Sequence, residues 1–195
     1  MKKLVISFFL FFGIMYSQEK ADAKNVKYDG NYYLYMSSNS YLGKNYIANQ
    51  YKDNLGLGFD YTFLKYENFN AGIGFEYNSL IENEDKIFKS SSKIDMYSVK
   101  FLIINYHLPI NQNFTLLPNF QYSFSRLNFI DLNAEQNGNN FRIGLNLRHR
   151  LISRYYVFGG INYNYLFLNV NASSEKENFY NHTNYLNFNL GFNLD

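Results

Sequence analysis

Large apolar residues and small or polar residues alternate one by one over several stretches of the chain. In residues 55–63 every odd position is Leu, Phe or Tyr, and every even position is Gly, Asp or Thr. Successive side chains of a β-strand point to opposite sides, so this alternation predicts a strand with one apolar and one polar face. The pattern recurs in residues 71–77, 114–124, 141–148, 157–167 and 186–194, and more weakly in 32–37 and 97–105. We therefore predict eight strands.

Two of these stretches depart from strict alternation. Leu117 is an apolar residue on the polar face of residues 114–124. Leu102 and Ile104 fall on the face of residues 97–105 that the alternation assigns to polar side chains. We retain both stretches as strands and expect these three side chains to lie on the polar side of the sheet.

The predicted strands are joined by connections of two lengths. Short connections follow the second, fourth and sixth strands, at residues 65–70, 107–113 and 149–154. Longer polar connections follow the first, third, fifth and seventh strands, at residues 39–52, 81–93, 127–139 and 169–181. Transmembrane barrels place tight turns at the periplasmic face and long loops at the outer face. The pattern predicts that both ends of the barrel chain lie on the periplasmic side.

Residues 1–17 have the form of a secretory signal peptide. Lys2 and Lys3 precede an apolar run over residues 4–15, and this run is too short for a spanning helix. Cleavage fits after Ser17 or after Ala23, and an uncleaved N-terminal anchor is the alternative. We expect a signal peptide at residues 1–17 and a barrel in residues 18–195. No later run is long enough for a membrane helix, so strands would have to span the bilayer.

Charge and composition exclude several function classes. Lys2 and Lys3 account for the whole formal net charge of +2, so the chain without its leader is neutral and we expect no nucleic-acid partner. The chain has no Cys, which excludes disulfides, thiolate metal sites, Cys nucleophiles and lipoprotein acylation. We expect no cofactor and no metal.

A soluble calycin-like barrel would alternate too, with its apolar face inward. The polar face here is mostly Gly, Asn, Ser and Thr, with few of the Lys and Glu of a solvated sheet, which favours a membrane barrel.

Four segments carry a resemblance to a known family. They are residues 54–60 (NLGLGFD), 71–77 (AGIGFEY), 97–106 (YSVKFLIINY) and 190–194 (LGFNL). The chain resembles the Bacteroidota outer-membrane β-barrel family, which is related in architecture to OmpA-type transmembrane domains. The resemblance implies an all-β, eight-stranded antiparallel up-and-down barrel in the cell outer membrane. It also implies contact with membrane lipid and lipopolysaccharide, insertion by the barrel-assembly machinery, and a monomer. One departure is the ending Leu194-Asp195, where many such barrels end in an aromatic residue.

Five charged residues fall on the lumen face of the predicted strands: Asp60, Glu76, Lys100, Arg142 and Arg148. An eight-stranded barrel is just wide enough for its side chains to fill it, so opposite charges inside should pair. From their heights along the strands we expect Asp60 to pair with Arg148 and Glu76 with Arg142. We interpret the set as a structural ion-pair network, with a narrow gated pore as the alternative.

Other candidate chemistry is weaker. Gly56, Gly58, Gly72 and Gly74 lie inside strands and open no helix, so they make room in the lumen and do not bind phosphate. His182, beside Thr183 and near Glu177, is the one histidine at the predicted outer rim, and no strand shows a His with a suitably spaced Ser and acid.

The sequence therefore favours a non-enzymatic barrel with a structural or surface-interaction role, whose external loops are rich in Ser, Asn, Lys and Glu. The alternatives are a narrow gated pore for small solutes or ions, a lipid A-modifying outer-membrane enzyme, and a soluble calycin-like ligand binder.

Overall fold

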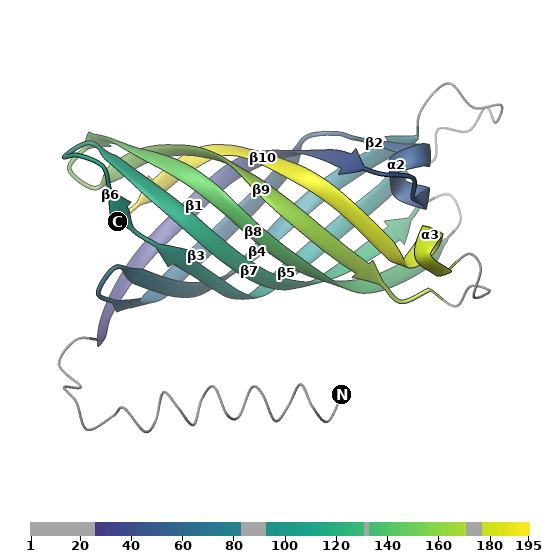
Figure 1. Cartoon of the computed structure of the whole chain (residues 1–195), viewed down its shortest axis with the longest axis horizontal. Helices are drawn as coiled ribbons and strands as arrows, with labels where there is room; N and C mark the ends of the chain where they lie inside the picture. Colours follow the sequence, from purple (N-terminus) through teal and green to yellow (C-terminus); the bar gives the residue numbers. More distant parts are fainter. Residues whose placement is uncertain (1–25, 83–92, 131–132, 171–176) are drawn as a thin grey trace.

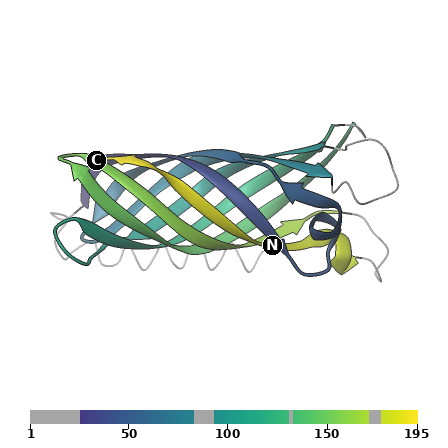
Figure 2. The same cartoon turned by 90° about the horizontal axis from the view of Figure 1, so that it is seen from above.

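The computed structural model describes residues 26–82, 93–130, 133–170 and 177–195, and within them eight long strands form a closed barrel (Figures 1 and 2). The long strands are β1 (Val26–Leu42), β3 (Gly56–Tyr66), β4 (Phe69–Glu82), β5 (Lys93–Tyr106), β7 (Phe114–Phe129), β8 (Ala134–Ile152), β9 (Tyr155–Leu168) and β10 (His182–Leu194). The short elements are β2 (Tyr51–Asp53), β6 (Leu108–Pro109), α2 (Tyr46–Gln50) and α3 (Glu177–Asn181). Neither described helix is long and apolar enough to cross a membrane.

The eight long strands are antiparallel, and each pairs with its neighbour along the chain. The first strand, β1, also pairs with the last, β10, over residues 32–42 and 184–194. The sheet therefore closes on itself and leaves no edge strand with unpaired backbone N–H and C=O groups, as a membrane-spanning sheet requires. The predicted eight-stranded antiparallel barrel is confirmed. The predicted leader and both candidate cleavage sites lie outside the described residues.

The two ends of the barrel differ (Figure 1). At one end, called here the turn end, lie the connections 67–68, 107–113 and 153–154, the start of β1 and the end of β10. At the other, called the loop end, lie the connection 43–55 with α2, the helix α3, the ends of β4, β7 and β9, and the starts of β5, β8 and β10. The prediction that both ends of the barrel chain lie beside the short connections is confirmed.

Along the middle of the barrel, apolar side chains point outward and polar side chains point inward. Phe75, Leu145 and Phe188 are each more than 40% exposed, whereas Glu76 and Asn187 are fully buried in the lumen. Tyr61 is also on the outside, where its ring stacks on Tyr32 at 4.8 Å. A calycin-like barrel would show the opposite orientation, so that alternative is excluded.

The predicted orientation of Leu102 and Ile104 is wrong. Phe101 has no partner on either neighbouring strand: Lys100 pairs with Gly74 and Ser123, and the pairing resumes only beyond it. This β-bulge inserts one extra residue into β5 and shifts the phase of the alternation. Leu102 and Ile104 consequently turn outward, and Ile103 and Asn105 are buried in the lumen.

The long connection predicted at residues 127–139 is also wrong. β7 continues to Phe129 and β8 begins at Ala134, so only residues 130–133 join them. In this outer part of the hairpin the polarity is inverted: Leu127 and Phe129 are buried inside, while Arg126 is exposed outside. The segment resembles a polar loop in sequence because its outward residues face water and not lipid.

Candidate functional site in the barrel lumen

The five charged residues expected in the lumen all point inward and are at least nine-tenths buried. They come from four strands: Asp60 from β3, Glu76 from β4, Lys100 from β5, and Arg142 and Arg148 from β8. Charges so far from water need close partners of opposite sign. The structure provides such partners, but not always the expected ones.

Glu76 and Arg142 meet across the lumen, as the sequence led us to expect. Nη1 of Arg142 lies 2.7 Å from Oε2 of Glu76, and Nη2 lies 3.1 Å from Oε1. This two-pronged geometry is the strong form of a carboxylate–guanidinium pair. The Arg142 Nε also donates to Asn164 at 2.6 Å, and Glu76 accepts from the Tyr35 hydroxyl at 2.9 Å. The pair joins opposite sides of the barrel through fully buried atoms.

Lys100 lies between the two carboxylates. Its Nζ is 3.0 Å from Oδ1 of Asp60 and 3.1 Å from Oε2 of Glu76, and it also donates to the Tyr35 hydroxyl. The sequence placed Lys100 in the lumen without a partner. The register supplies one: Asp60, Gly74 and Lys100 lie in one row across β3, β4 and β5, and Gly74 has no side chain to separate the other two. Two acids and two bases thus form a neutral network.

The expected pair of Asp60 with Arg148 is wrong. Arg148 lies nearer the turn end, where its Nη1 is 3.0 Å from Oδ1 of Asp195 and 2.9 Å from Oδ1 of Asn193. Its guanidinium also covers the Tyr156 ring at 4.1 Å. Arg148 therefore pairs with a carboxylate at the end of β10, because Lys100 already neutralises Asp60.

Inward glycines make these close approaches possible. Gly58 lies in the row between Tyr35 and Glu76, which are hydrogen-bonded to each other. The same arrangement holds for Gly74 between Asp60 and Lys100, Gly144 between Asn119 and Asn162, and Gly191 between Tyr35 and Phe158. A Cβ added at any of the four would clash with a neighbouring strand or side chain. Glycine here makes room in a narrow lumen, as the sequence suggested.

An apolar cluster fills the loop end of the lumen, and the sequence did not predict it. It is built from ten buried side chains: Ile47, Tyr51, Leu80, Ile94, Met96, Leu127, Phe129, Leu166, Leu168 and Tyr185. Its signal in the sequence is the inverted alternation at the ends of β5, β7 and β9, where apolar residues occupy inward positions. We call this set the loop-end cluster.

The connection between β1 and β3 covers the loop-end cluster. Helix α2 inserts Ile47 into it and is capped by Asn45, whose Oδ1 accepts from the Ala48 N–H at 2.9 Å. At the end of β2, Asp53 accepts from the backbone N–H of Asn39 at 2.6 Å and from its Nδ2 at 3.0 Å. Burial raises the pKa of the Asp53 carboxyl to about 6. This connection is thereby fastened to β1 and closes the mouth of the lumen.

His107 and His182 lie in different surroundings at the two ends of the barrel. Burial, with the positive charges of Arg148 and Lys65, lowers the pKa of His107 to about 4, so its ring is neutral at neutral pH. His182 hydrogen-bonds the Tyr165 hydroxyl at 2.6 Å and lies against the Tyr165 and Phe167 rings. The Glu177 side chain, expected near it, lies outside the described part. In the described residues no group of three or more His, Asp or Glu side chains could hold a metal ion.

Comparisons with known proteins agree with the fold. No protein-family model matches the chain, and no curated protein matches its sequence. Among solved structures, the chain is similar to Neisserial surface protein A, with a TM-score of 0.59 and 8% identity over 85% of this chain and 96% of that chain. It is also similar to a major outer membrane protein from Thermus thermophilus, with a TM-score of 0.50 and 10% identity over 85% of this chain and 99% of that chain. At such low identity the likeness concerns the fold alone.

The outward apolar side chains along the middle of the barrel, called here the apolar belt, indicate where in the cell the protein lies. A closed antiparallel barrel with apolar side chains over the middle of its exterior is stable only where lipid covers that surface. Closed barrels of this size with a filled lumen are a form in which bacterial outer membranes are spanned. The chain is an outer-membrane β-barrel protein.

Proposed function

We propose that the protein is a closed, non-catalytic barrel whose role is structural or lies in surface interaction at its loop end. The observation that carries the proposal is that the lumen is closed at two separate levels. Buried ion pairs cross its middle, and the loop-end cluster fills its mouth beneath α2. A solute or ion would have to displace both, and the connections at the loop end are then the part available to a partner.

The same proposal includes how the chain is exported, how it is inserted and which way it faces in the membrane. A signal peptide at residues 1–17 exports the chain, and the barrel-assembly machinery inserts it as a monomer in contact with lipid and lipopolysaccharide. The loop end faces the medium, because both ends of the barrel chain lie at the turn end. The resemblance of residues 54–60 and 71–77 supports an origin in the Bacteroidota. The neutral charge of the chain without its leader supports the absence of a nucleic-acid partner.

The wild-type protein should give no conductance steps in planar lipid bilayers. The double variant Ile47→Ser, Leu127→Ser disrupts the loop-end cluster, and the double variant Glu76→Gln, Arg142→Gln removes an ion pair. Each leaves the other level closed, so neither double variant should conduct by itself. The combined four-site variant should give small steps. Heat-modified gel migration would show that each variant remains a folded barrel. Steps from the wild-type protein at neutral pH would overturn the proposal in favour of a narrow pore.

The orientation can be tested by thiol labelling, because the chain has no native Cys to give background. A membrane-impermeant maleimide on intact cells should label Lys44→Cys, which is exposed at the loop end. Asn68→Cys and Gln112→Cys, both exposed at the turn end, should react only after the outer membrane is permeabilised. Labelling of the turn-end positions from outside would show that the barrel is inserted the other way.

A further inference from the structure

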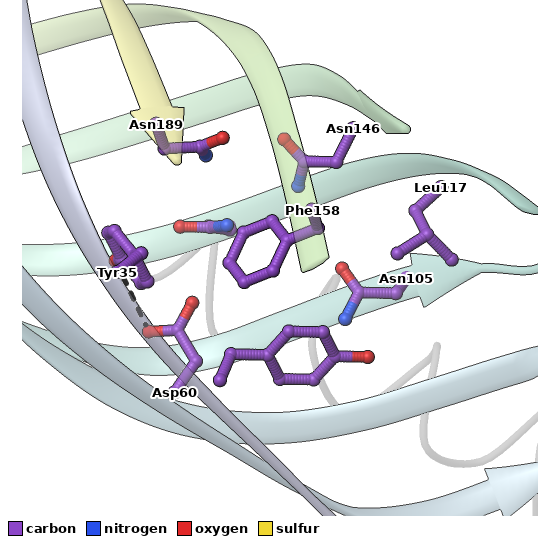
Figure 3. A pocket seen from close by; sticks show the side chains of 9 residues that line it. Tyr35, Asp60, Asn105, Leu117, Asn146, Phe158 and Asn189 are labelled. Carbon is purple, nitrogen blue, oxygen red and sulfur yellow. Dashed lines mark hydrogen bonds between the residues drawn. The ribbon is translucent and has the colours of Figure 1, made fainter. Parts of the chain in front are cut away.

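A small cavity lies inside the barrel between the charge network and the turn end (Figure 3). Its volume is about 10 Å³, close to the space that one water molecule occupies. The polar residues around it include Gln121 of β7, Asn146 of β8 and Asn189 of β10, and Leu117 and Phe158 form apolar walls. Figure 3 shows the amide ends of Asn146 and Asn189 pointing toward each other across this space.

Three buried amide oxygens at the cavity have no hydrogen-bond partner in the described part of the protein. They are Oε1 of Gln121, Oδ1 of Asn146 and Oδ1 of Asn189. Each of these side chains is at least nine-tenths buried. A buried carbonyl without a donor is strongly unfavourable, and native proteins rarely leave one so. The Tyr33 hydroxyl lines the same cavity and also has no partner among the described residues, so the four atoms together indicate a small hydrogen-bonding molecule inside it.

The row of Gly160 places the cavity between two of these amides. Gly160 lies between Asn146 and Asn189, as Gly58, Gly74, Gly144 and Gly191 each lie between two larger side chains. In those four rows the two flanking side chains contact each other over the glycine. In the Gly160 row the flanking amides make no such contact, and the cavity lies there instead.

We infer that the cavity is a binding site for one water molecule, which donates its two protons to Oδ1 of Asn146 and Oδ1 of Asn189 on either side of Gly160. Water fits the volume, and buried waters typically make two to four hydrogen bonds. A metal cation would also suit three amide oxygens. However, Asp60 and Glu76 are already balanced by Lys100 and Arg142, so a cation would add an uncompensated charge to a buried site.

The site and the loop-end cluster lie on opposite sides of the ion pairs. The water lies on the turn-end side, and the loop-end cluster lies on the other. This inference does not depend on what the loop end binds.

Nuclear magnetic resonance of the full-length mature protein in nanodiscs can test for the water. The side-chain amide protons of Asn146, Asn189 and Gln121 should show cross-relaxation with a long-lived water. Those of Asn162 should not, because Asn162 bonds directly to Asn119 and Asn187. Absence of the signal at the first three positions in the folded protein would overturn the inference. Shifts at Asn146 and Asn189 that saturate with added Na⁺ or K⁺ would overturn it too, in favour of a cation.

Variants separate a hydrated cavity from a dry one. A Cβ from Gly160→Ala would clash with the Asn146 amide, so this variant should lose the water signal at Asn189, whereas Gly144→Ala should lower stability without losing it. If Gly160→Ala does not fold, the direction in which Asn146→Leu changes the unfolding temperature gives a second test. Leu has nearly the same shape as Asn, so loss of a water-bonded amide should lower the unfolding temperature. A raised unfolding temperature would mean that Oδ1 had no partner in a dry cavity.

Discussion

Replacing Arg142 with Gln should lower the free energy of unfolding by about 3–5 kcal/mol. The reason is that Glu76 would lose its two-pronged partner at 2.7 and 3.1 Å and would remain buried with only Lys100 to balance two acids. Equilibrium unfolding in detergent or lipid would measure the loss. Arg126→Gln is the matched control, because Arg126 pairs with Glu135 on the exposed outer surface and should change stability by about 1 kcal/mol or less.

A double-mutant cycle identifies the pair itself. Glu76→Gln should also be strongly destabilising, and the double variant should be less unstable than the sum of the two single losses. We expect a coupling energy above about 1 kcal/mol for Glu76 with Arg142. The pair of Asp60 with Arg148, which the structure does not form, should show almost none. Coupling near zero for Glu76 with Arg142 would mean that water separates these charges.

Replacing Leu145 with Arg should lower stability in bilayers by about 2–4 kcal/mol, because Leu145 faces lipid near the middle of β8. Unfolding in phospholipid vesicles is the appropriate measurement, since detergent can adapt to a local charge. Asn146→Leu, one position along and facing the lumen, should be far milder.

A control on the same face locates the edge of the lipid belt. Asn137 points outward from β8 as Leu145 does, but it is level with Arg126, beyond the apolar belt. Asn137→Arg should therefore change stability by no more than about 1 kcal/mol. Equal losses at the two positions would mean that lipid covers the whole strand, contrary to the inverted polarity of its outer part.

Much of the barrel follows from alternation alone, because lipid outside and polar contacts inside impose a period of two on each strand. That rule places Leu145 and Asn146 correctly on opposite faces. It fails at Phe101, because one extra residue in β5 shifts every later side chain. The departure of Leu102 and Ile104 from the alternation is the trace of this bulge in the sequence. It fails again at Leu127, because the rule assumes lipid outside and this part of β7 faces water.

The lumen contacts depend on register, which a single strand does not reveal. Glu76 and Arg142 could be paired from their heights along the strands, but the same reasoning failed for Arg148, six residues further along β8. Lys100 could not be assigned to Asp60 without knowing that Gly74 lies between them. Likewise, the partner of Arg148 comes from the last residue of the chain, Asp195, which strand alternation does not place. Pairing across a barrel requires the positions of several strands at once.

The inverted polarity along β7 means that two different environments, lipid and water, stabilise the two parts of one strand. Its inner part, with Phe120 and Phe124 outward, is held by the bilayer, and its outer part, with Leu127 and Phe129 inward, by the exclusion of water from the loop-end cluster. Urea in the aqueous phase acts directly on the outer part, whereas a change of lipid chain length acts on the inner part. The outer rim can then open locally while the transmembrane section keeps its hydrogen bonds, so loss of surface structure and loss of membrane insertion become separate events.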